Sequence, residues 1–358
     1  MTLSTIKKKE KAFLVGVTFN SREDVSYSLE ELTNLSGTAN LDVVGTDWQY
    51  VREINPATIL GTGKLEEIKE KVQILCADVV IVDYSLTGSQ LRNIGDALGV
   101  RVIDRTLLIL DIFAGRANSA EGKLQVKLAL NRYYLPRLSS ISGTSGRFGS
   151  GGVGMRGPGE TKLELDKRAI ARDIESLEKE IEKIKERRLI NRNMRTKSGK
   201  KKIAIIGYTN AGKSTLLNLM TKENIYADDK LFATLDTTTR ALWLDVGKEV
   251  VLTDTVGFIS KLPHNLVDAF SATLEEAADA DLLLHIVDVV SPHYKEQMQV
   301  VFEVVKDIGA SHIPMIIAYN KCDMLGGPFE IKNNEILVSA AKNINIDKLK
   351  AKFIEILF

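Results

Sequence analysis

The N-terminal third of the chain alternates short apolar runs with segments in which apolar residues recur at helical spacing. The apolar runs predict buried strands at Ala12–Thr18, Asp78–Asp83 and Val100–Ile103. The segments between them predict helices at Arg22–Leu35, Lys64–Cys76 and Ser89–Leu98. Because this alternation is typical of a parallel α/β sheet, we expect a small sheet of that kind.

The middle of the chain has a different pattern. Long helical patterns cover Glu121–Leu138 and Glu160–Arg195, and the segment between them, Ser142–Gly159, contains eight glycines. Two long helices joined by such a loop predict a projecting antiparallel hairpin. A run of ten basic residues and one acidic residue, Lys183–Lys202, ends this part of the chain. Such a run indicates either a solvated helix end with its linker or a local binding surface.

From Lys202 onward, strands and helices alternate regularly, which is typical of a doubly wound α/β domain. The expected strands are Ile203–Ile206, Ala241–Asp245, Val250–Thr253, Leu282–Val287, Met315–Tyr319 and Glu335–Val338. We therefore divide the chain into an N-terminal α/β subdomain (residues 1–117), a helical hairpin (118–197) and a doubly wound domain (198–358).

Composition and charge narrow the class of protein. The 358 residues include 44% hydrophobic residues, 48 basic residues and 47 acidic residues, which excludes a globally basic coat for nucleic acid. The two cysteines, Cys76 and Cys322, cannot form a disulfide framework. Because we find neither a signal-peptide pattern nor an apolar run of about 18 residues, the sequence predicts a cytoplasmic protein without a membrane span.

The clearest motif is a phosphate-binding loop. Gly207–Ser214 reads GYTNAGKS, follows the IAIIG strand and opens the predicted helix Thr215–Met220, which is the context that the pattern GxxxxGKS requires. In such loops the main-chain N–H groups surround the phosphates, the lysine contacts the β- and γ-phosphates, and the serine hydroxyl binds Mg²⁺. The predicted phosphate contacts are Gly207, Tyr208, Thr209, Asn210, Ala211, Gly212, Lys213, Ser214 and Thr215.

A second motif, Asp254-Thr-Val-Gly257, ends the next pair of strands. A carboxylate at the end of a strand can reach Mg²⁺ through water, and the amide of Gly257 can sense the γ-phosphate. We therefore place Asp254 at the metal and expect Thr255, Val256 and Gly257 to lie along the nucleotide.

A third motif, Asn320-Lys-Cys-Asp323, predicts the base. The Asp323 carboxylate can accept both N1–H and N2–H of guanine, an arrangement that adenine does not offer. Lys321 and Cys322 would lie beside the base, and Asn320 would tie this loop to the phosphate loop. The main chain of Ser339, Ala340 and Ala341 would supply an N–H to guanine O6. The three motifs in this order predict a protein that binds GTP and GDP.

The segment Phe232–Arg240 is rich in threonine, and one threonine should complete the Mg²⁺ shell when the γ-phosphate is present. Composition alone does not choose among Thr234, Thr237, Thr238 and Thr239, and three of these four are expected to be strand surface.

At this point the chain resembles the HflX family of GTPases. The motifs that carry the resemblance include GYTNAGKS, FATLD, DTVGFI and NKCD in the last domain, and DRTLLILDIFAGRA, LPRL and GGVGMRGPGETKLELDKR upstream. The resemblance implies an N-terminal α/β HflX domain with a helical hairpin, followed by a P-loop GTPase domain. It also implies GTP hydrolysis, and ribosome binding, chiefly to the large subunit, with a role in splitting or rescuing stalled ribosomes. Alignment with FATLD makes Thr234 the magnesium ligand, with Phe232, Ala233, Leu235 and Asp236 beside it.

The chain departs from the family pattern at two places. Thr237 stands where proline usually follows FATLD, so the backbone there is less restricted. After Ser339–Lys342 only one final helix fits, and we expect no extra C-terminal domain. Separately, we expect the protein to be monomeric.

The expected catalytic residues are Lys213, Thr234, Gly257 and Asn210. Phe258 occupies the place where many small GTPases have a water-orienting glutamine, which predicts slow intrinsic hydrolysis. By its position in the phosphate loop, Asn210 resembles an asparagine that binds a monovalent cation in some related GTPases. The resemblance makes K⁺ a candidate cofactor. The alternative is that Asn210 only braces a tight turn.

The glycine-rich loop either serves only as a flexible connector between the two helices or becomes ordered on a partner, which could be RNA or protein. With RNA, Arg147 and Arg156 would meet phosphates and Phe148 could stack on a base. The alternative is a GTP-gated protein-binding module whose hairpin docks a protein. A shorter motif, Gly61–Lys64, lacks the spacing and the trailing Ser or Thr of a phosphate loop and predicts the start of a helix.

Overall fold

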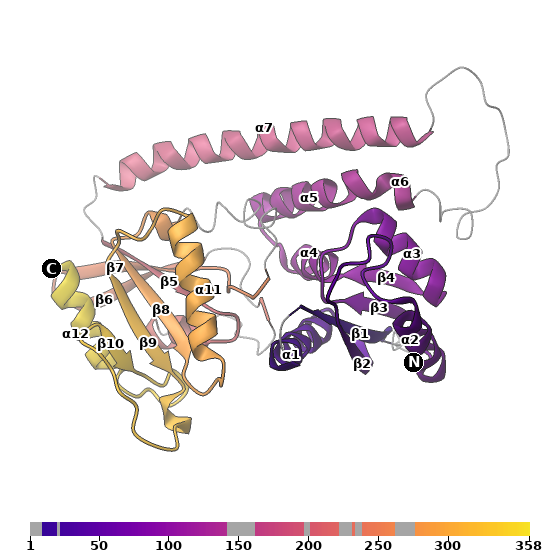
Figure 1. Cartoon of the computed structure of the whole chain (residues 1–358). Coiled ribbons are helices and arrows are strands. Elements are labelled where there is room, and N and C mark those ends of the chain that lie inside the picture. Colours follow the sequence, from indigo (N-terminus) through magenta and orange to yellow (C-terminus); the bar gives the residue numbers. More distant parts are fainter. Residues whose placement is uncertain are drawn as a thin grey trace, which may run out of the picture. The chain divides into compact units, whose positions relative to one another are not determined.

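The computed structural model describes residues 9–19, 22–141, 162–196, 201–221, 231–232, 238–261 and 276–358 (Figure 1). The chain divides into two compact units. One comprises Met1–Gly115 with Val126–Lys179, and the other comprises Arg116–Gln125 with Glu180–Phe358. Each unit is described by itself.

The first unit contains a four-stranded sheet in the order β2-β1-β3-β4, and every neighbouring pair is parallel. This confirms the predicted small parallel sheet. Its core is formed by buried side chains such as Phe13, Val80 and Ile94. The strands are β1 (Lys11–Thr18), β2 (Asp42–Tyr50), β3 (Val79–Val82) and β4 (Arg101–Asp104), and the helices are α1 (Arg22–Thr38), α2 (Thr62–Leu75), α3 (Gly88–Leu98) and α4 (Arg105–Arg116).

Two of these elements, β2 and α4, are not among those that the hydrophobic pattern predicts. β2 is an edge strand with no fully buried residue, so its sequence DVVGTDWQY lacks a continuous apolar run. α4 follows β4 without an intervening loop, and the Asp104 carboxylate caps it by accepting a hydrogen bond from the Leu107 N–H at 2.9 Å. In the sequence, only the capping residue Asp104 marks the boundary between β4 and α4.

A buried charge cluster joins α1, α4 and the end of β3. The Arg105 guanidinium donates to the Asp83 carboxylate at 2.8 Å and also to Glu31, and Asp83 accepts a further bond from Ser28. Arg105, Asp83 and Glu31 are 3%, 0% and 6% exposed, so their charges are satisfied by one another rather than by water.

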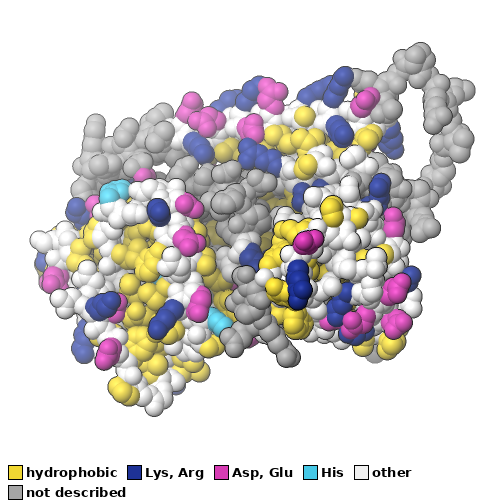
Figure 2. Space-filling view, viewed as in Figure 1, with side chains coloured by type: hydrophobic (Ala, Val, Ile, Leu, Met, Phe, Trp, Pro, Cys, Tyr) yellow, Lys and Arg dark blue, Asp and Glu magenta, His cyan; other side chains and the backbone are white. Residues whose placement is uncertain are grey.

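The hairpin helices are α5 (Ala120–Tyr134) and α7 (Lys162–Thr196), with a short helical stretch, Leu135–Arg137, and α6 (Leu138–Ile141) after α5. The chain runs out along α5 and α6 and returns along α7 (Figure 1), and Arg132 pairs with Glu178 at 2.8 Å. Acidic and basic side chains are interspersed along the described part of α7 (Figure 2). The glycine-rich loop Ser142–Gly159 lies outside the described residues.

The second unit contains a six-stranded sheet in the order β10-β9-β8-β5-β7-β6. All neighbouring pairs are parallel except β6 and β7, which are antiparallel because the two-residue turn Val246–Gly247 joins them, with φ of +75° at Gly247. The strands are β5 (Lys201–Gly207), β6 (Thr238–Asp245), β7 (Lys248–Asp254), β8 (Leu282–Asp288), β9 (Met315–Asn320) and β10 (Glu335–Leu337), and the helices include α8 (Lys213–Thr221), α11 (Tyr294–Asp307) and α12 (Ile346–Leu357).

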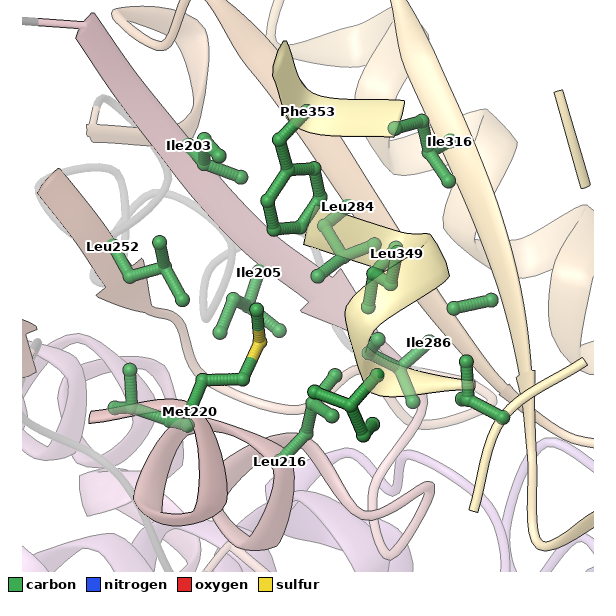
Figure 3. Close-up of a cluster of buried hydrophobic side chains, with 14 of the residues drawn as sticks. Ile203, Ile205, Leu216, Met220, Leu252, Leu284, Ile286, Ile316, Leu349 and Phe353 are labelled. Carbon is green, nitrogen blue, oxygen red and sulfur yellow. The ribbon is translucent and has the colours of Figure 1, made fainter. Parts of the chain in front are cut away.

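The core of this unit holds the central strands against two helices (Figure 3). Ile205 of β5 and Leu284 of β8 lie in one buried cluster with Leu216 of α8 and Phe353 of α12. Because β5 and α8 are both fixed in this core, the loop between them is held at both ends. Among the helices that the structure describes, none is long and apolar enough to cross a membrane.

Candidate nucleotide site

The phosphate loop lies between β5 and α8, as the motif predicts. Gly212 has φ of +93°, and a Cβ at this position would lie 2.2 Å from Nδ2 of Asn320, so only glycine fits. Asn210 is exposed and has φ of +60°, a conformation that asparagine tolerates better than most residues. The loop is therefore shaped by close approach to β9 as well as by its own sequence.

Lys213 is buried inside this loop. Its Nζ donates to the main-chain oxygens of Gly207 at 3.1 Å and Tyr208 at 2.7 Å. Burial lowers the pKa of Lys213 to about 8, and the nearby Asp254 carboxylate opposes this shift. An anion at the loop would stabilise the charged form of this lysine, which is the electrostatic requirement of a phosphate site.

Ser214 and Asp254 form the candidate metal site. Ser214 Oγ donates to Asp254 Oδ2 at 2.8 Å, and Thr255 Oγ1 donates to the Ile205 carbonyl at 2.8 Å, which anchors the end of β7 to β5. A hydroxyl and a carboxylate are the hard oxygen ligands that Mg²⁺ prefers, so these residues fit that ion. Thr215, the next residue of α8, is exposed.

The segment after β7 lies against the phosphate loop. A Cβ at Gly257 would be 2.8 Å from Nζ of Lys213, and Val256 is buried beside it. The Phe258 side chain is 4% exposed and carries no hydrogen-bonding group. The structure therefore brings Gly257 next to Lys213 and directs Phe258 into the interior.

Asn320 ties three loops together. Its Nδ2 donates to the Ala211 carbonyl at 2.9 Å, and its Oδ1 accepts from the Ala340 N–H at 3.0 Å. The phosphate loop, the NKCD segment and the segment after β10 are thereby fixed to one another. Ser339 is fully buried, and Ala341 is exposed.

The other NKCD residues form a turn directly after β9. Lys321 has φ of +64° and its Nζ pairs with Oδ2 of Asp288 at 2.6 Å. Burial raises the pKa of the Cys322 thiol, and the Asp323 carboxylate beside it is exposed. The Cys322 N–H donates to the Val338 carbonyl at 3.1 Å, which ties this turn to the residue that follows β10.

The threonine-rich segment is described only in part. Phe232 is buried with φ of +55°, whereas Ala233, Thr234, Leu235, Asp236 and Thr237 lie outside the described residues. Thr238 and Thr239 begin β6, and Thr239 Oγ1 lies 3.3 Å from Thr253 Oγ1 on β7. These two threonines therefore belong to a strand, as expected for most of the four.

Sequence reasoning missed the roles of two side chains in β8. Asp288, the last residue of β8, belongs to none of the motifs in the sequence, but it lies opposite Asn320 in the sheet and pairs with Lys321. His285 is 1% exposed, and burial lowers its pKa to about 3, with Lys213 adding to the effect. The carboxyl ends of adjacent parallel strands lie together at one edge of a sheet. The position of Asp288 at the end of its predicted strand could therefore have placed it near the NKCD turn.

The other motif in the chain that resembled a phosphate loop begins a helix. Lys64, in the first turn of α2, pairs with Asp47 at 2.7 Å and Glu67 at 3.0 Å. Within the ranges that the structure describes, no group of three or more His, Cys, Asp and Glu side chains could hold a metal ion.

A buried lysine in a strand–loop–helix turn, a Ser–Asp pair beside it and an NKCD turn at the ends of neighbouring strands define a P-loop GTP-binding protein. Family models match most of the chain: GTP-binding GTPase N-terminal at residues 26–114, GTP-binding GTPase Middle Region at 116–195, and 50S ribosome-binding GTPase at 202–321.

The chain belongs to the HflX family of GTPases. It is 51% identical over 343 residues to GTPase HflX of Caldanaerobacter subterraneus, which covers 96% of this chain and 79% of that protein. It is 41% identical over 349 residues to GTPase HflX of Escherichia coli, covering 95% and 81%. A GTP-binding protein from Sulfolobus solfataricus in complex with GDP superposes with a TM-score of 0.51 at 27% identity, over 97% of this chain and 98% of that one.

Proposed function

We propose that this GTPase acts on the ribosome, chiefly on the large subunit, and takes part in splitting or rescuing stalled ribosomes. The observation that carries the proposal is the match of residues 202–321 to the family described as 50S ribosome-binding GTPase. The phosphate loop, the Ser214–Asp254 pair, Asn320 and Lys321 lie within those residues, whereas Cys322, Asp323 and the segment after β10 follow them. A ribosomal partner would place the protein in the cytoplasm.

We assign the roles at the site from chemistry and position. Lys213 and the main chain of Gly207–Thr215 hold the phosphates, and Gly257 contacts the γ-phosphate. Ser214, Asp254 and Thr234 hold Mg²⁺, which would neutralise charge on the phosphates. Support for the first two ligands is their 2.8 Å hydrogen bond, and the assignment of Thr234 rests on the sequence.

Base recognition is assigned to the NKCD turn. Asp323 accepts from guanine, Lys321 lies along the base, and Ser339–Ala341 face O6. Asn210 is a candidate K⁺ ligand beside the phosphates, and its exposure leaves it open to an ion. The left-handed backbone of Asn210 equally suits a residue that only braces the turn.

The division into residues 1–117, 118–197 and 198–358 remains our proposal for the functional parts. It is supported by the bounds of the family matches, since one match ends and the next begins at residues 114–116 and again at residues 195–202. The compact units instead divide within α5, between Gln125 and Val126, and within α7, between Lys179 and Glu180.

The direct test is co-sedimentation of the full chain with purified 30S, 50S and 70S particles, in a GTP analogue, in GDP and without nucleotide. We expect retention on 50S and 70S particles in the GTP analogue, and the appearance of free subunits when 70S particles are incubated with GTP. Binding to 30S particles alone, or equal binding in all nucleotide states, would contradict the proposal.

A loop variant separates RNA from protein as the partner of the hairpin. Replacing Ser142–Gly159 by a short Gly-Ser turn should reduce sedimentation with 50S particles while GDP affinity stays unchanged. Contacts with rRNA phosphates should also weaken steeply with salt. Salt-independent binding to a purified ribosomal protein would favour the protein-docking alternative instead.

A further inference from the structure

The segment after β7 is joined to the phosphate loop by main-chain hydrogen bonds. Phe258 N–H donates to the Gly207 carbonyl at 3.1 Å, and Thr209 N–H donates to the Phe258 carbonyl at 2.8 Å. Tyr208 and Phe258 thereby form an isolated parallel bridge that extends the pairing beyond the end of β5. These two bonds do not depend on the side chain at position 208, since they join only the main chains of Gly207, Thr209 and Phe258.

The Tyr208 side chain adds a third bond that few residues could supply. Its phenol oxygen accepts a hydrogen bond from the Ser260 N–H at 2.6 Å, and Tyr208 is 5% exposed. A phenylalanine would fill the same space and leave the Ser260 N–H without this acceptor. The hydroxyl therefore fixes the main chain two residues beyond Phe258.

The position of this segment matters for the reaction. Gly257 lies immediately before Phe258, and a Cβ there would be 2.8 Å from Nζ of Lys213 and 2.9 Å from Cγ2 of Thr209. A small displacement of residues 257–260 would therefore move main-chain groups next to the phosphate-binding lysine. Because the Phe258 side chain is buried and apolar, it cannot orient the attacking water itself. Hydrolysis then depends more on the position of the main chain of this segment.

We propose that Tyr208 is a positioning residue for GTP hydrolysis, acting through its hydroxyl on the Ser260 main chain and so on the placement of Gly257. The inference rests on the proposed roles of Lys213 and Gly257 and is independent of the ribosomal partner. The proposed effect is carried by one hydrogen bond, from the Ser260 N–H in the segment after β7 to the Tyr208 hydroxyl in the phosphate loop.

The first test is whether this bond exists in solution. Residue-resolved hydrogen exchange of the full chain bound to GDP should show faster exchange of the Ser260 amide in Tyr208→Phe, with the Phe258 amide still protected by the Gly207 carbonyl. Equal exchange of the Ser260 amide in wild type and variant would overturn the proposal.

The second test is single-turnover GTP hydrolysis without ribosomes. Tyr208→Phe should lower the rate roughly twofold to tenfold, the range that one lost hydrogen bond allows. The dissociation constants for GTP and GDP should change by less than about twofold, because the main-chain contacts stay. Tyr294→Phe, in the aromatic cluster beside Tyr319, is the matched control and should leave rate and affinity unchanged.

The outcomes separate this inference from the assignment of the site. A variant that loses affinity and rate in proportion would show a merely structural role for the hydroxyl, and an unchanged rate would show no role in hydrolysis. Either result overturns the proposal. If instead the wild-type chain bound no guanine nucleotide, the site itself would be wrong.

Discussion

Ser214 Oγ donates a 2.8 Å hydrogen bond to Oδ2 of Asp254, which joins the first turn of α8 to the carboxyl end of β7 across forty residues of sequence. Both groups are oxygen donors of the kind that bind Mg²⁺, and both lie beside Lys213. The bond therefore brings the two candidate metal ligands together at the phosphate loop.

This pair predicts the magnesium dependence of hydrolysis. Asp254→Asn should weaken Mg²⁺ affinity about 10- to 100-fold, because the carboxylate is expected to act on the ion through bound water. The measurement is the Mg²⁺ concentration at half-maximal single-turnover GTP hydrolysis. Asp281→Asn, which alters a carboxylate bonded to the Lys202 N–H at 2.8 Å, is the control and should leave this midpoint unchanged. Equal midpoints for Asp254→Asn and wild type would remove Asp254 from the metal site.

Base selection is predicted to reside in Asp323. Asp323→Asn replaces an acceptor carboxylate by an amide, and two hydrogen bonds to a charged group are worth roughly 1.5–3 kcal/mol each. GTP affinity should therefore fall by at least about a hundredfold, while xanthosine triphosphate affinity rises because its 2-oxo group accepts from the amide. Asp288→Asn, which loosens Lys321, should weaken both nucleotides without reversing the preference. Unchanged GTP affinity in Asp323→Asn would show that the base lies elsewhere.

A potassium role for Asn210 predicts a cation-specific rate. A K⁺ ion beside the β- and γ-phosphates could supply charge that an arginine finger provides elsewhere, an effect of roughly 10³–10⁵ in rate for such fingers. Single-turnover hydrolysis should be faster in K⁺ than in Na⁺ at matched ionic strength, and Asn210→Ala should abolish the difference. Equal rates in both salts for the wild-type chain would leave Asn210 as a residue that shapes the turn.

The buried His285 predicts acid sensitivity of the second unit. Burial lowers its pKa to about 3 from an ordinary value of 6.5, so the unfolded chain binds one more proton between these values. The free energy of unfolding is therefore unaffected by His285 protonation above about pH 6.5. Between about pH 6.5 and pH 3 it falls by about 1.4 kcal/mol for each pH unit that the pH is lowered. His285→Leu should lose less stability than wild type between pH 6.5 and 4.5, as measured by hydrogen exchange of the β8 amides in urea.

An exposed histidine gives the control for that measurement. His312 lies on the surface and its Nδ1 is 3.0 Å from the Gly309 carbonyl oxygen. His312→Gln should retain the acid sensitivity of the wild-type chain. If His285→Leu and wild type lost stability in parallel, protonation of His285 would not be the cause.

The buried cluster in the first unit predicts a large effect on stability. Arg105→Met would remove the guanidinium that pairs with the buried Asp83 and Glu31 carboxylates, and removing one partner of a buried ion pair costs about 3–5 kcal/mol. Trp48 of β2 reports urea unfolding of this unit by fluorescence in a Trp243→Phe background. The exposed Arg101, paired with Glu10 at 2.9 Å, is the matched control, and Arg101→Met should cost at most about 1 kcal/mol. Similar losses in the two variants would contradict this account of the cluster.

The sequence by itself determined the elements and motifs that depend on neighbouring residues. GYTNAGKS between an apolar strand and a helix predicts a phosphate loop because the residues that identify it lie within eight consecutive positions. Buried strands such as β3 and β8 were predictable because continuous apolar runs mark them. β2 was not, since an edge strand with half-buried residues carries no such run.

The tertiary structure decided which distant side chains meet. The bonds from Ser214 to Asp254, from Lys321 to Asp288 and from the Ser260 N–H to Tyr208 depend on β5 lying between β7 and β8, with β9 beyond. Hydrophobic periodicity identifies a strand but fixes neither its neighbours nor its register, because every buried strand presents similar apolar surface to the core. Strand order and register came from packing of the whole sheet, and they placed Asp288 beside Lys321 and the Tyr208 hydroxyl beside the Ser260 N–H.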